Sequence, residues 1–287
     1  MNENEAFDPQ QFKAEARDSW SRAAIGWNVH TPQIRRWLAN ATSAMLDAAN
    51  ILPGSCVVDV AAGAGDQTLD AARRVGPNGY VLATDISPNI LHFAATNARG
   101  HGFDNVQTMV ADAENLNLPA ASFDAAICRL GLMFCPDPKR SLQEIHHALK
   151  PGSRVSVLVY SQVERNPCLA IVMQTALEYA GLPWPDPYMP GTLFSLSRPG
   201  DIGELFASAK FHDITTSAIP AAFSLPSAFA YVEFIRTSTS SVMRLLGMLT
   251  PSAREAALLE MESRLRQFQT PSGWEGPNEL LLTAGAR

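Results

Sequence analysis

One stretch of twelve residues, 57–68, constrains the fold more than any other part of this chain. Residues 57–60 are mostly β-branched, which is typical of a buried strand. Residues 61–65 follow, and the two glycines among them allow a turn in which backbone can approach a ligand closely. Residues 66–68 (Asp-Gln-Thr) then open a helix. This order predicts a nucleotide-type cofactor site in an open α/β sheet.

A second apolar run, at residues 80–84, ends in Asp85, 20 positions beyond Gly65. The carboxyl ends of neighbouring parallel strands meet at one edge of a sheet, so Asp85 is placed to accept hydrogen bonds from the hydroxyls of a ribose. Asp59 and Asp66 are expected at the same edge. A tight turn alone does not explain three clustered carboxylates.

The choice of cofactor depends on two positions in the turn. A dinucleotide site is expected to have a third glycine where this chain has Thr68. Asp66 at the helix start would also repel a pyrophosphate. S-adenosylmethionine has no phosphate and carries an ammonium and a sulfonium, so acidic residues favour it. The sequence therefore predicts S-adenosylmethionine rather than NAD.

Strands and helices alternate through the middle of the chain. Further strands are predicted at 106–110, 123–128 and 154–160, and helices at 66–75, 88–99 and 138–149. Such alternation requires a parallel sheet with helices on both faces. The predicted fold class is α/β: a Rossmann-like, seven-stranded, mostly parallel sheet with a helical cap.

The remaining segments give the expected domain organisation. Residues 1–54 form an N-terminal helical cover over the cofactor, and 55–220 form the core. Within the core, 161–200 hold six prolines and form a lid. Residues 221–270 form a cap, in which 227–268 are expected to be two amphipathic helices broken at Thr250-Pro251. Residues 271–287 are expected to form the last strand of the core, antiparallel at or near the sheet edge.

Composition excludes several classes of protein. The formal net charge is −6, and no run of Lys and Arg provides the basic stripe that a nucleic-acid binder needs. No apolar run approaches 18 residues, so stable membrane insertion is not expected. The acidic start at residues 1–5 lacks the features of a secretion signal, and a cytoplasmic protein is expected.

The cysteines carry no metal-binding signature. Cys56, Cys128, Cys135 and Cys168 form no C-x-x-C pair. Reduced thiols and no metal site are therefore expected, a zinc-type site being the weaker alternative.

The order of motifs resembles the class I S-adenosylmethionine-dependent methyltransferases, and most closely the ubiquinone/menaquinone-biosynthesis type. The likeness covers about residues 20–160. It rests on the segments 59–65 (DVAAGAG), 83–87 (ATDIS), 111–114 (ADAE), 129–134 (RLGLMF) and 149–152 (LKPG).

The resemblance implies roles for residues at each of these segments. Ala61, Gly63 and Gly65 would lie against the methionyl part of the cofactor, together with Asp59. Asp85 would hold the ribose and Ile86 would pack on the adenine; Asp112 and Ala113 would meet the adenine amino group, and Arg129 would border the methionine end. Trp27 belongs to the N-terminal segment that folds over the cofactor. From the residues alone, the alternative for Asp59 is a strand-end carboxylate satisfied by backbone N–H groups, and the alternative for Asp112 is a turn former.

The expected activity is methyl transfer to a small acceptor, apolar or aromatic, because Met and aromatic residues recur in the lid and cap. His30 and Tyr160 are the catalytic candidates. His30 is alternatively a solvated turn histidine, and Tyr160 merely a group lining the site. An NAD-dependent oxidoreductase and a non-catalytic S-adenosylmethionine-binding protein are the alternative functions. The acceptor, the methylated atom and the oligomeric state stay open.

Overall fold

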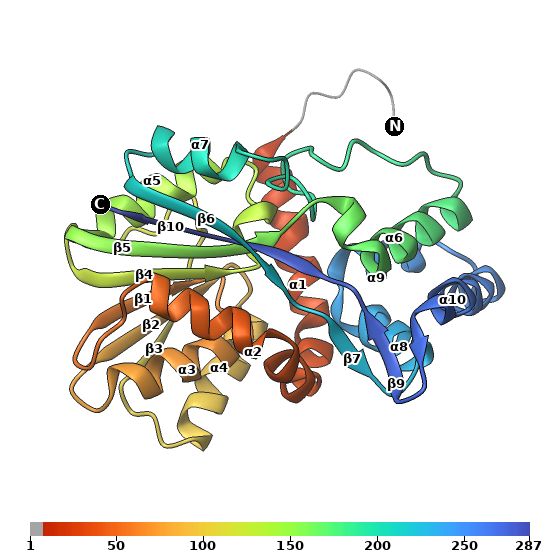
Figure 1. Ribbon diagram of the computed structural model, residues 1–287, viewed down its shortest axis with the longest axis horizontal. Helices are drawn as coiled ribbons and strands as arrows, with labels where there is room; N and C mark the ends of the chain where they lie inside the picture. Colours follow the sequence, from red (N-terminus) through yellow and green to blue (C-terminus); the bar gives the residue numbers. More distant parts are fainter. Residues whose placement is uncertain (1–7) are drawn as a thin grey trace.

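The computed structural model describes residues 8–287, so the acidic start at residues 1–5 lies outside the described part. Seven strands form the main sheet in the order β3-β2-β1-β4-β5-β10-β6 (Figure 1). Their bounds are β1 Cys56–Val60, β2 Tyr80–Asp85, β3 Val106–Val110, β4 Phe123–Arg129, β5 Leu149–Tyr160, β6 His212–Pro220 and β10 Glu279–Ala286.

The pairing of the strands confirms the predicted fold class. β1 pairs in parallel with β2 and β4, β2 with β3, and β4 with β5. β10 is antiparallel to both β5 and β6 and lies one strand in from the edge. The carboxyl ends of β1, β2, β3, β4 and β5 therefore meet at one edge of the sheet.

Helices cover both faces of this sheet. α2 (Thr31–Ala48), α3 (Asp66–Val75) and α4 (Pro88–Gly100) pack side by side, and α5 (Pro138–Ala148) packs with α7 (Asp201–Ser208) (Figure 1). α3, α4 and α5 each connect two neighbouring parallel strands. Short 3₁₀ turns lie at Leu132–Phe134, Val163–Arg165 and Arg266–Phe268.

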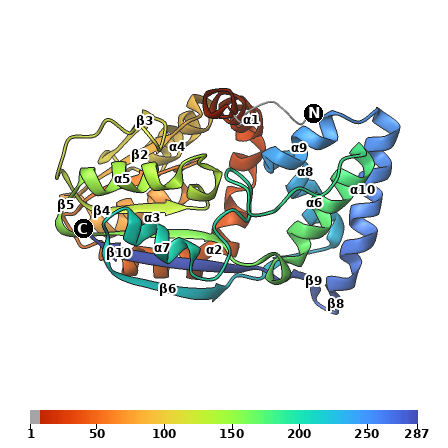
Figure 2. The ribbon, with the colours of Figure 1, turned by 90° about the horizontal axis from the view of Figure 1, so that it is seen from above.

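Beyond the carboxyl ends of the strands, four helices and a small sheet form a second cluster, as Figure 2 shows. The helices are α6 (Pro167–Ala180), α8 (Ala228–Ser238), α9 (Ser240–Gly247) and α10 (Pro251–Leu265). The three-stranded sheet has the order β7-β9-β8, with bounds Phe223–Leu225, Gly273–Gly276 and Gln269–Thr270. None of the helices between residues 8 and 287 is long and apolar enough to span a membrane.

The prediction of two helices within residues 227–268 is wrong, because three form there. α8 ends at Ser238, and Thr239 has extended backbone (φ −97°, ψ 103°) before α9 begins. Hydroxyl side chains compete with the helical ladder: Ser238 Oγ donates to the carbonyl of Phe234, and Thr237 Oγ1 donates to that of Glu233. The run of Ser and Thr at 237–241 thus divides the segment.

A long first helix joins the two parts of the molecule. α1 (Pro9–Val29) contacts α4 beside the sheet and α8 and α9 in the second cluster, and Figure 1 shows it between them. The closest approach is at Gly26, where an added Cβ would lie 1.8 Å from the carbonyl oxygen of Thr237. Only a glycine lets these two helices approach so closely.

Gly26→Ala should therefore destabilise the protein, because the new methyl group forces α1 away from α8. Overpacking of this kind costs about 1–3 kcal/mol, and each kcal/mol lowers the melting temperature by roughly 2–4 °C in a domain of this size. Thermal unfolding checks this. Gly100→Ala, at the end of α4 with no atom within 4 Å of the new Cβ, is the matched control and should not lower the melting temperature. Equal melting temperatures for the two variants would contradict the packing argument.

Candidate functional site

The carboxyl edge of the sheet borders a cavity with about 850 Å³ of empty space, part of it open to solvent. We term it the sheet-edge cavity. Its walls come from the ends of β1, β2, β3 and β4, and α1 covers it. The lining residues are Phe12, Lys13, Ala16, Trp20, Trp27, Val60, Ala61, Gly63, Thr84, Asp85, Ile86, Ile90, Ala111, Asp112, Ala113, Glu114, Arg129, Leu130, Gly131, Phe134, Cys135 and Pro136.

The glycine turn after β1 has left-handed backbone at three positions. φ is 56° at Ala61, 58° at Gly63 and 86° at Gly65. A side chain at Gly65 would collide with Ala94 on α4, whose Cβ would be 2.9 Å away. Gly65 is therefore required by helix packing and lies outside the cavity wall, whereas Ala61 and Gly63 line it. Ala61 is a strained position for a residue with a Cβ, which is a common feature of functional sites.

Asp85 ties the glycine turn to the next strand. One carboxylate oxygen accepts the backbone N–H of Gly63 (3.0 Å), and the other accepts that of Ser87 (2.9 Å). Burial raises the pKa of Asp85 to about 6, although the backbone hydrogen bonds oppose this. A carboxylate has about four acceptor sites, so these two bonds leave lone pairs free toward the cavity.

Lys13 of α1 fastens the helix over the cavity. Its Nζ contacts Asp112 Oδ2 at 2.8 Å and Glu114 Oε2 at 2.5 Å. Asp112 Oδ1 also accepts the backbone N–H of Glu114, so Asp112 forms the local turn as well as lining the cavity. No local pattern indicated a role for Lys13, because its partners lie about a hundred positions away along the chain.

The other two carboxylates of the cluster have structural partners. Asp59 is fully buried and accepts hydrogen bonds from Thr68 Oγ1 (2.6 Å) and Gln67 Nε2 (3.2 Å), and burial raises its pKa to about 7. It does not line the cavity. Thr68, in place of a third glycine, thus anchors the start of α3 to β1.

Asp66 is neutralised by Arg129, with 2.5 Å between the carboxylate and the guanidinium and both side chains buried. This corrects the sequence argument that Asp66 presents a free negative charge to the ligand. Arg129 also donates to Thr42 Oγ1 of α2 at 2.9 Å. The end of β4 is therefore joined to α3 and α2 at once.

A second, aromatic cavity lies next to the first and has about 550 Å³ of empty space, part of it open to solvent. No charged side chain of residues 8–287 lines it. Its lining residues are Trp20, Trp27, Trp37, Leu130, Met133, Phe134, Tyr160, Leu169, Leu193, Phe223, Tyr231, Phe234, Ile235, Ser238, Thr239, Ser240, Ser241 and Asn278. The two cavities share Trp20, Trp27, Leu130 and Phe134.

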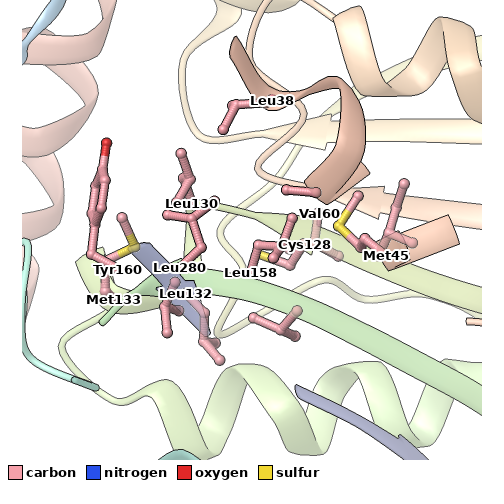
Figure 3. Close-up of a cluster of buried hydrophobic side chains, with 14 of the residues drawn as sticks. Leu38, Met45, Val60, Cys128, Leu130, Leu132, Met133, Leu158, Tyr160 and Leu280 are labelled. Atoms are coloured by element: carbon pink, nitrogen blue, oxygen red, sulfur yellow. The ribbon is translucent and has the colours of Figure 1, made fainter. Parts of the chain in front are cut away.

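The shared wall is held by unusual backbone and by ring contacts. Leu130 has φ of 57°, and its N–H donates to the carbonyl of Leu158 at 2.8 Å. Leu130 and Tyr160 both line the aromatic cavity, and Figure 3 draws both within one cluster of buried side chains. The rings of Trp20 and Trp27 meet edge to face at 5.8 Å, and those of Trp20 and Phe134 at 5.6 Å.

The two catalytic candidates have different surroundings. Tyr160 lines the aromatic cavity, and burial raises the pKa of its hydroxyl above the usual 10. His30 lines neither cavity. Its ring nitrogens lie 2.6 Å from Gln33 Oε1 and 3.0 Å from Thr237 Oγ1, so it joins the α1–α2 corner to α8.

Ten cofactor-binding residues were predicted, and the structure gathers eight of them around the sheet-edge cavity: Trp27, Ala61, Gly63, Asp85, Ile86, Asp112, Ala113 and Arg129. Asp59 and Gly65 support the turn from behind. Leu130 and Phe134 belong to the motif at residues 129–134, but nothing in the sequence indicated that they border two cavities.

Known proteins are similar in sequence to part of this chain. The ubiquinone/menaquinone biosynthesis C-methyltransferase of Hahella chejuensis is 36% identical over 118 residues, 41% of this chain and 47% of that protein. The 2-phytyl-1,4-naphtoquinone methyltransferase of Nostoc punctiforme is 37% identical over 125 residues, which are 43% of this chain and 54% of that protein. The chain spans about half the length of the curated relatives it matches.

Solved structures share the fold. The crystal structure of a putative methyltransferase from Bacillus halodurans matches with a TM-score of 0.58 at 18% identity, covering 85% of this chain and 97% of that one. The match confirms the fold.

The ubiE/COQ5 methyltransferase family matches residues 32–179, just over half of the chain. This confirms the resemblance to S-adenosylmethionine-dependent methyltransferases and the cofactor predicted from Thr68 and the acidic turn, and it decides against an NAD-dependent oxidoreductase. The chain belongs to the ubiE/COQ5 methyltransferase family.

Proposed function

We propose that this protein transfers the methyl group of S-adenosylmethionine to a small, neutral, aromatic acceptor. The observation that carries the proposal is the wall shared by the two cavities, made by Trp20, Trp27, Leu130 and Phe134. A cofactor in the sheet-edge cavity and an acceptor in the aromatic cavity would meet where these four side chains border both cavities. Direct transfer requires the methyl carbon and the acceptor atom to come within about 3–3.5 Å of each other, so the two cavities would have to open into each other at this border.

Residues along the sheet-edge cavity suit successive parts of the cofactor. Asp85, with free lone pairs, would accept the ribose hydroxyls, and Ile86 would pack on the adenine. Asp112 and Ala113 would meet the adenine amino group. The methionyl part would lie along Ala61 and Gly63 toward Arg129, where the shared wall begins. Trp27, 3.3 Å from the position of a Cβ on Gly63, would close the cavity over it.

The acceptor is restricted by what the aromatic cavity lacks. No side chain from residues 8–287 that lines it carries a charge. An anionic or cationic acceptor would be buried there without a counterion, at a cost of several kcal/mol. A neutral ring system instead matches the aromatic walls.

When bound, S-adenosylmethionine supplies a methyl group already activated by the sulfonium. The protein's own part is to align the acceptor and exclude water. Tyr160, protonated by its burial, would hold the acceptor through a hydrogen bond, and no strong base faces it from the aromatic walls of the described chain. An acceptor carbon or oxygen that is itself nucleophilic suits this site.

We further propose that different segments of the chain have different roles in binding the cofactor and the acceptor. Residues 1–54 cover the cofactor, since α1 lines the sheet-edge cavity, and 55–220 with 271–287 form the core. The lid at 161–200 contributes Leu193 to the aromatic cavity, and the cap at 221–270 contributes Phe223 and Phe234. Acceptor choice therefore depends mainly on residues beyond the family match.

Cofactor affinity should depend on pH through Asp85. The ribose is held by the ionised carboxylate, whose pKa is about 6, so binding is full above this pH and is lost below it. Titration of S-adenosylhomocysteine by calorimetry should give an affinity about tenfold weaker at pH 5 than at pH 7. Asp85→Asn should bind more weakly at pH 7 and lose most of this pH dependence. An affinity of the wild type that is unchanged between pH 7 and pH 5 would refute the role of Asp85.

Turnover should follow the chemistry of the aromatic cavity. With methyl-labelled S-adenosylmethionine, we expect label in neutral phenols and hydroquinones and none in phosphoethanolamine.

Asp85→Ala should lower kcat/KM at least tenfold, because it removes hydrogen bonds to a charged group worth about 1.5–3 kcal/mol. Asp104→Ala, at an exposed carboxylate, is the matched control and should behave as the wild type. Tight binding of S-adenosylhomocysteine without label transfer to any acceptor would favour the non-catalytic alternative.

A further inference from the structure

The aromatic cavity contains three polar side chains that its apolar walls do not explain. Tyr160, Tyr231 and Asn278 line it and are 7%, 2% and 6% exposed. Tyr160 ends β5, Tyr231 lies in α8, and Asn278 immediately precedes β10. Three separate elements therefore bring polar atoms to one buried place.

These polar atoms have no partner within the described chain. Asn278 Oδ1 is buried without a hydrogen bond, while Nδ2 of the same side chain donates to the carbonyl of Gly276 at 3.3 Å. No hydrogen bond from residues 8–287 reaches the hydroxyl of Tyr160 or that of Tyr231. Among these atoms Asn278 Oδ1 is fully buried and unpaired, which is costly, and native proteins keep few such atoms. By contrast, Trp37 Nε1 donates to the carbonyl of Ala221, and Ser238 Oγ donates to that of Phe234.

The backbone holds Tyr160 and Asn278 at neighbouring positions, and Tyr231 lines the same cavity from α8. Tyr160 pairs with Leu280 across β5 and β10, which places Asn278 two residues along the same strand end. The N–H of Ser161 donates to the carbonyl of Glu279 at 3.0 Å, so the two chain segments stay joined beyond Tyr160. Tyr231 is fixed by stacking on Trp274, with ring centroids 4.7 Å apart. The set is therefore preformed rather than flexible.

We infer that Tyr160, Tyr231 and Asn278 form one hydrogen-bonding set that recognises a hydroxyl group on the aromatic acceptor. This inference rests on the proposed function, because it assigns the acceptor to the aromatic cavity. The two phenols donate, and the amide oxygen of Asn278 accepts. A hydroxyl satisfies both kinds of group, since it accepts from a tyrosine and donates to Asn278. A carbonyl leaves Asn278 unpaired, and a methyl group leaves all three unpaired.

The set also positions the acceptor. Tyr160 lines the aromatic cavity together with Leu130, which belongs to the wall shared with the sheet-edge cavity. A ring whose oxygen is held by Tyr160 would extend among Phe223, Phe234 and Trp37. Tyr160, Tyr231 and Asn278 are positioning residues, which select a hydroxylated ring and fix which edge of it faces the cofactor.

A pair of probes of equal shape tests the inference without turnover. 1-Naphthol and 1-methylnaphthalene differ by a hydroxyl in place of a methyl group. Binding is measured by quenching of the fluorescence of Trp20, Trp27 and Trp37, which line the cavity. The wild type should bind 1-naphthol about tenfold more tightly, as expected for one or two net hydrogen bonds. Tyr160→Phe and Asn278→Leu should each reduce this preference severalfold, and Tyr160→Phe/Tyr231→Phe should reduce it further, leaving only the hydrogen bond to Asn278.

The controls separate recognition from folding. Tyr179→Phe, at an exposed tyrosine of α6, should keep the wild-type preference. The melting temperature and the affinity for S-adenosylhomocysteine are measured on every variant and should stay close to those of the wild type. If only the Asn278 variant unfolds, the two tyrosine variants still decide the result.

Equal affinity of the wild type for both probes would overturn the inference, and so would a preference in Tyr160→Phe/Tyr231→Phe that is as large as that of the wild type. Failure of S-adenosylhomocysteine to bind the wild type would instead overturn the proposed function. A retained preference for 1-naphthol would then still support recognition of a hydroxyl group in this cavity.

Discussion

The buried ion pair between Asp66 and Arg129 is the interaction on which the arrangement of the two cavities depends. It joins the first residue of α3 to the last residue of β4, and Arg129 reaches Thr42 of α2 as well. Removing one partner of such a pair is costly, about 3–5 kcal/mol, because the other charge stays buried. The next residue along the chain is Leu130, whose left-handed backbone turns its side chain into the shared wall. The ion pair thus fixes where one cavity ends and the other begins.

Three aspartates at one edge of the sheet have three different roles. Asp59 is satisfied by Thr68 and Gln67 and holds the glycine turn from behind. Asp66 is neutralised by Arg129. Asp85 is the one of the three that lines the sheet-edge cavity, where it can meet a ligand while fixing Gly63. Spacing along the chain cannot separate these roles, because each depends on a partner from another element.

Local sequence was sufficient for the parallel core and for most of the cofactor wall. Strand alternation, the glycine turn and the helix caps are determined by residues that are neighbours in the sequence. The predicted strands at 57–60, 80–84 and 106–110 agree with β1, β2 and β3. Long-range contacts were not predictable in this way. Lys13 meets Asp112 across 99 positions, and His30 meets Thr237 across 207. The predicted catalytic role of His30 came from its place in the N-terminal segment, whereas its contacts place it at a corner between helices.

The central claim is that the methyl group passes from the sheet-edge cavity to an acceptor in the aromatic cavity at the border that Trp20, Trp27, Leu130 and Phe134 share. A crystal structure of the protein with S-adenosylmethionine tests it most directly. We predict that the ribose hydroxyls contact Asp85 and that the methyl carbon lies within contact distance, about 4–4.5 Å, of Leu130 or Phe134 and faces the aromatic cavity. A methyl carbon that faces solvent, or that is separated from the aromatic cavity by a closed layer of side chains, would contradict the account.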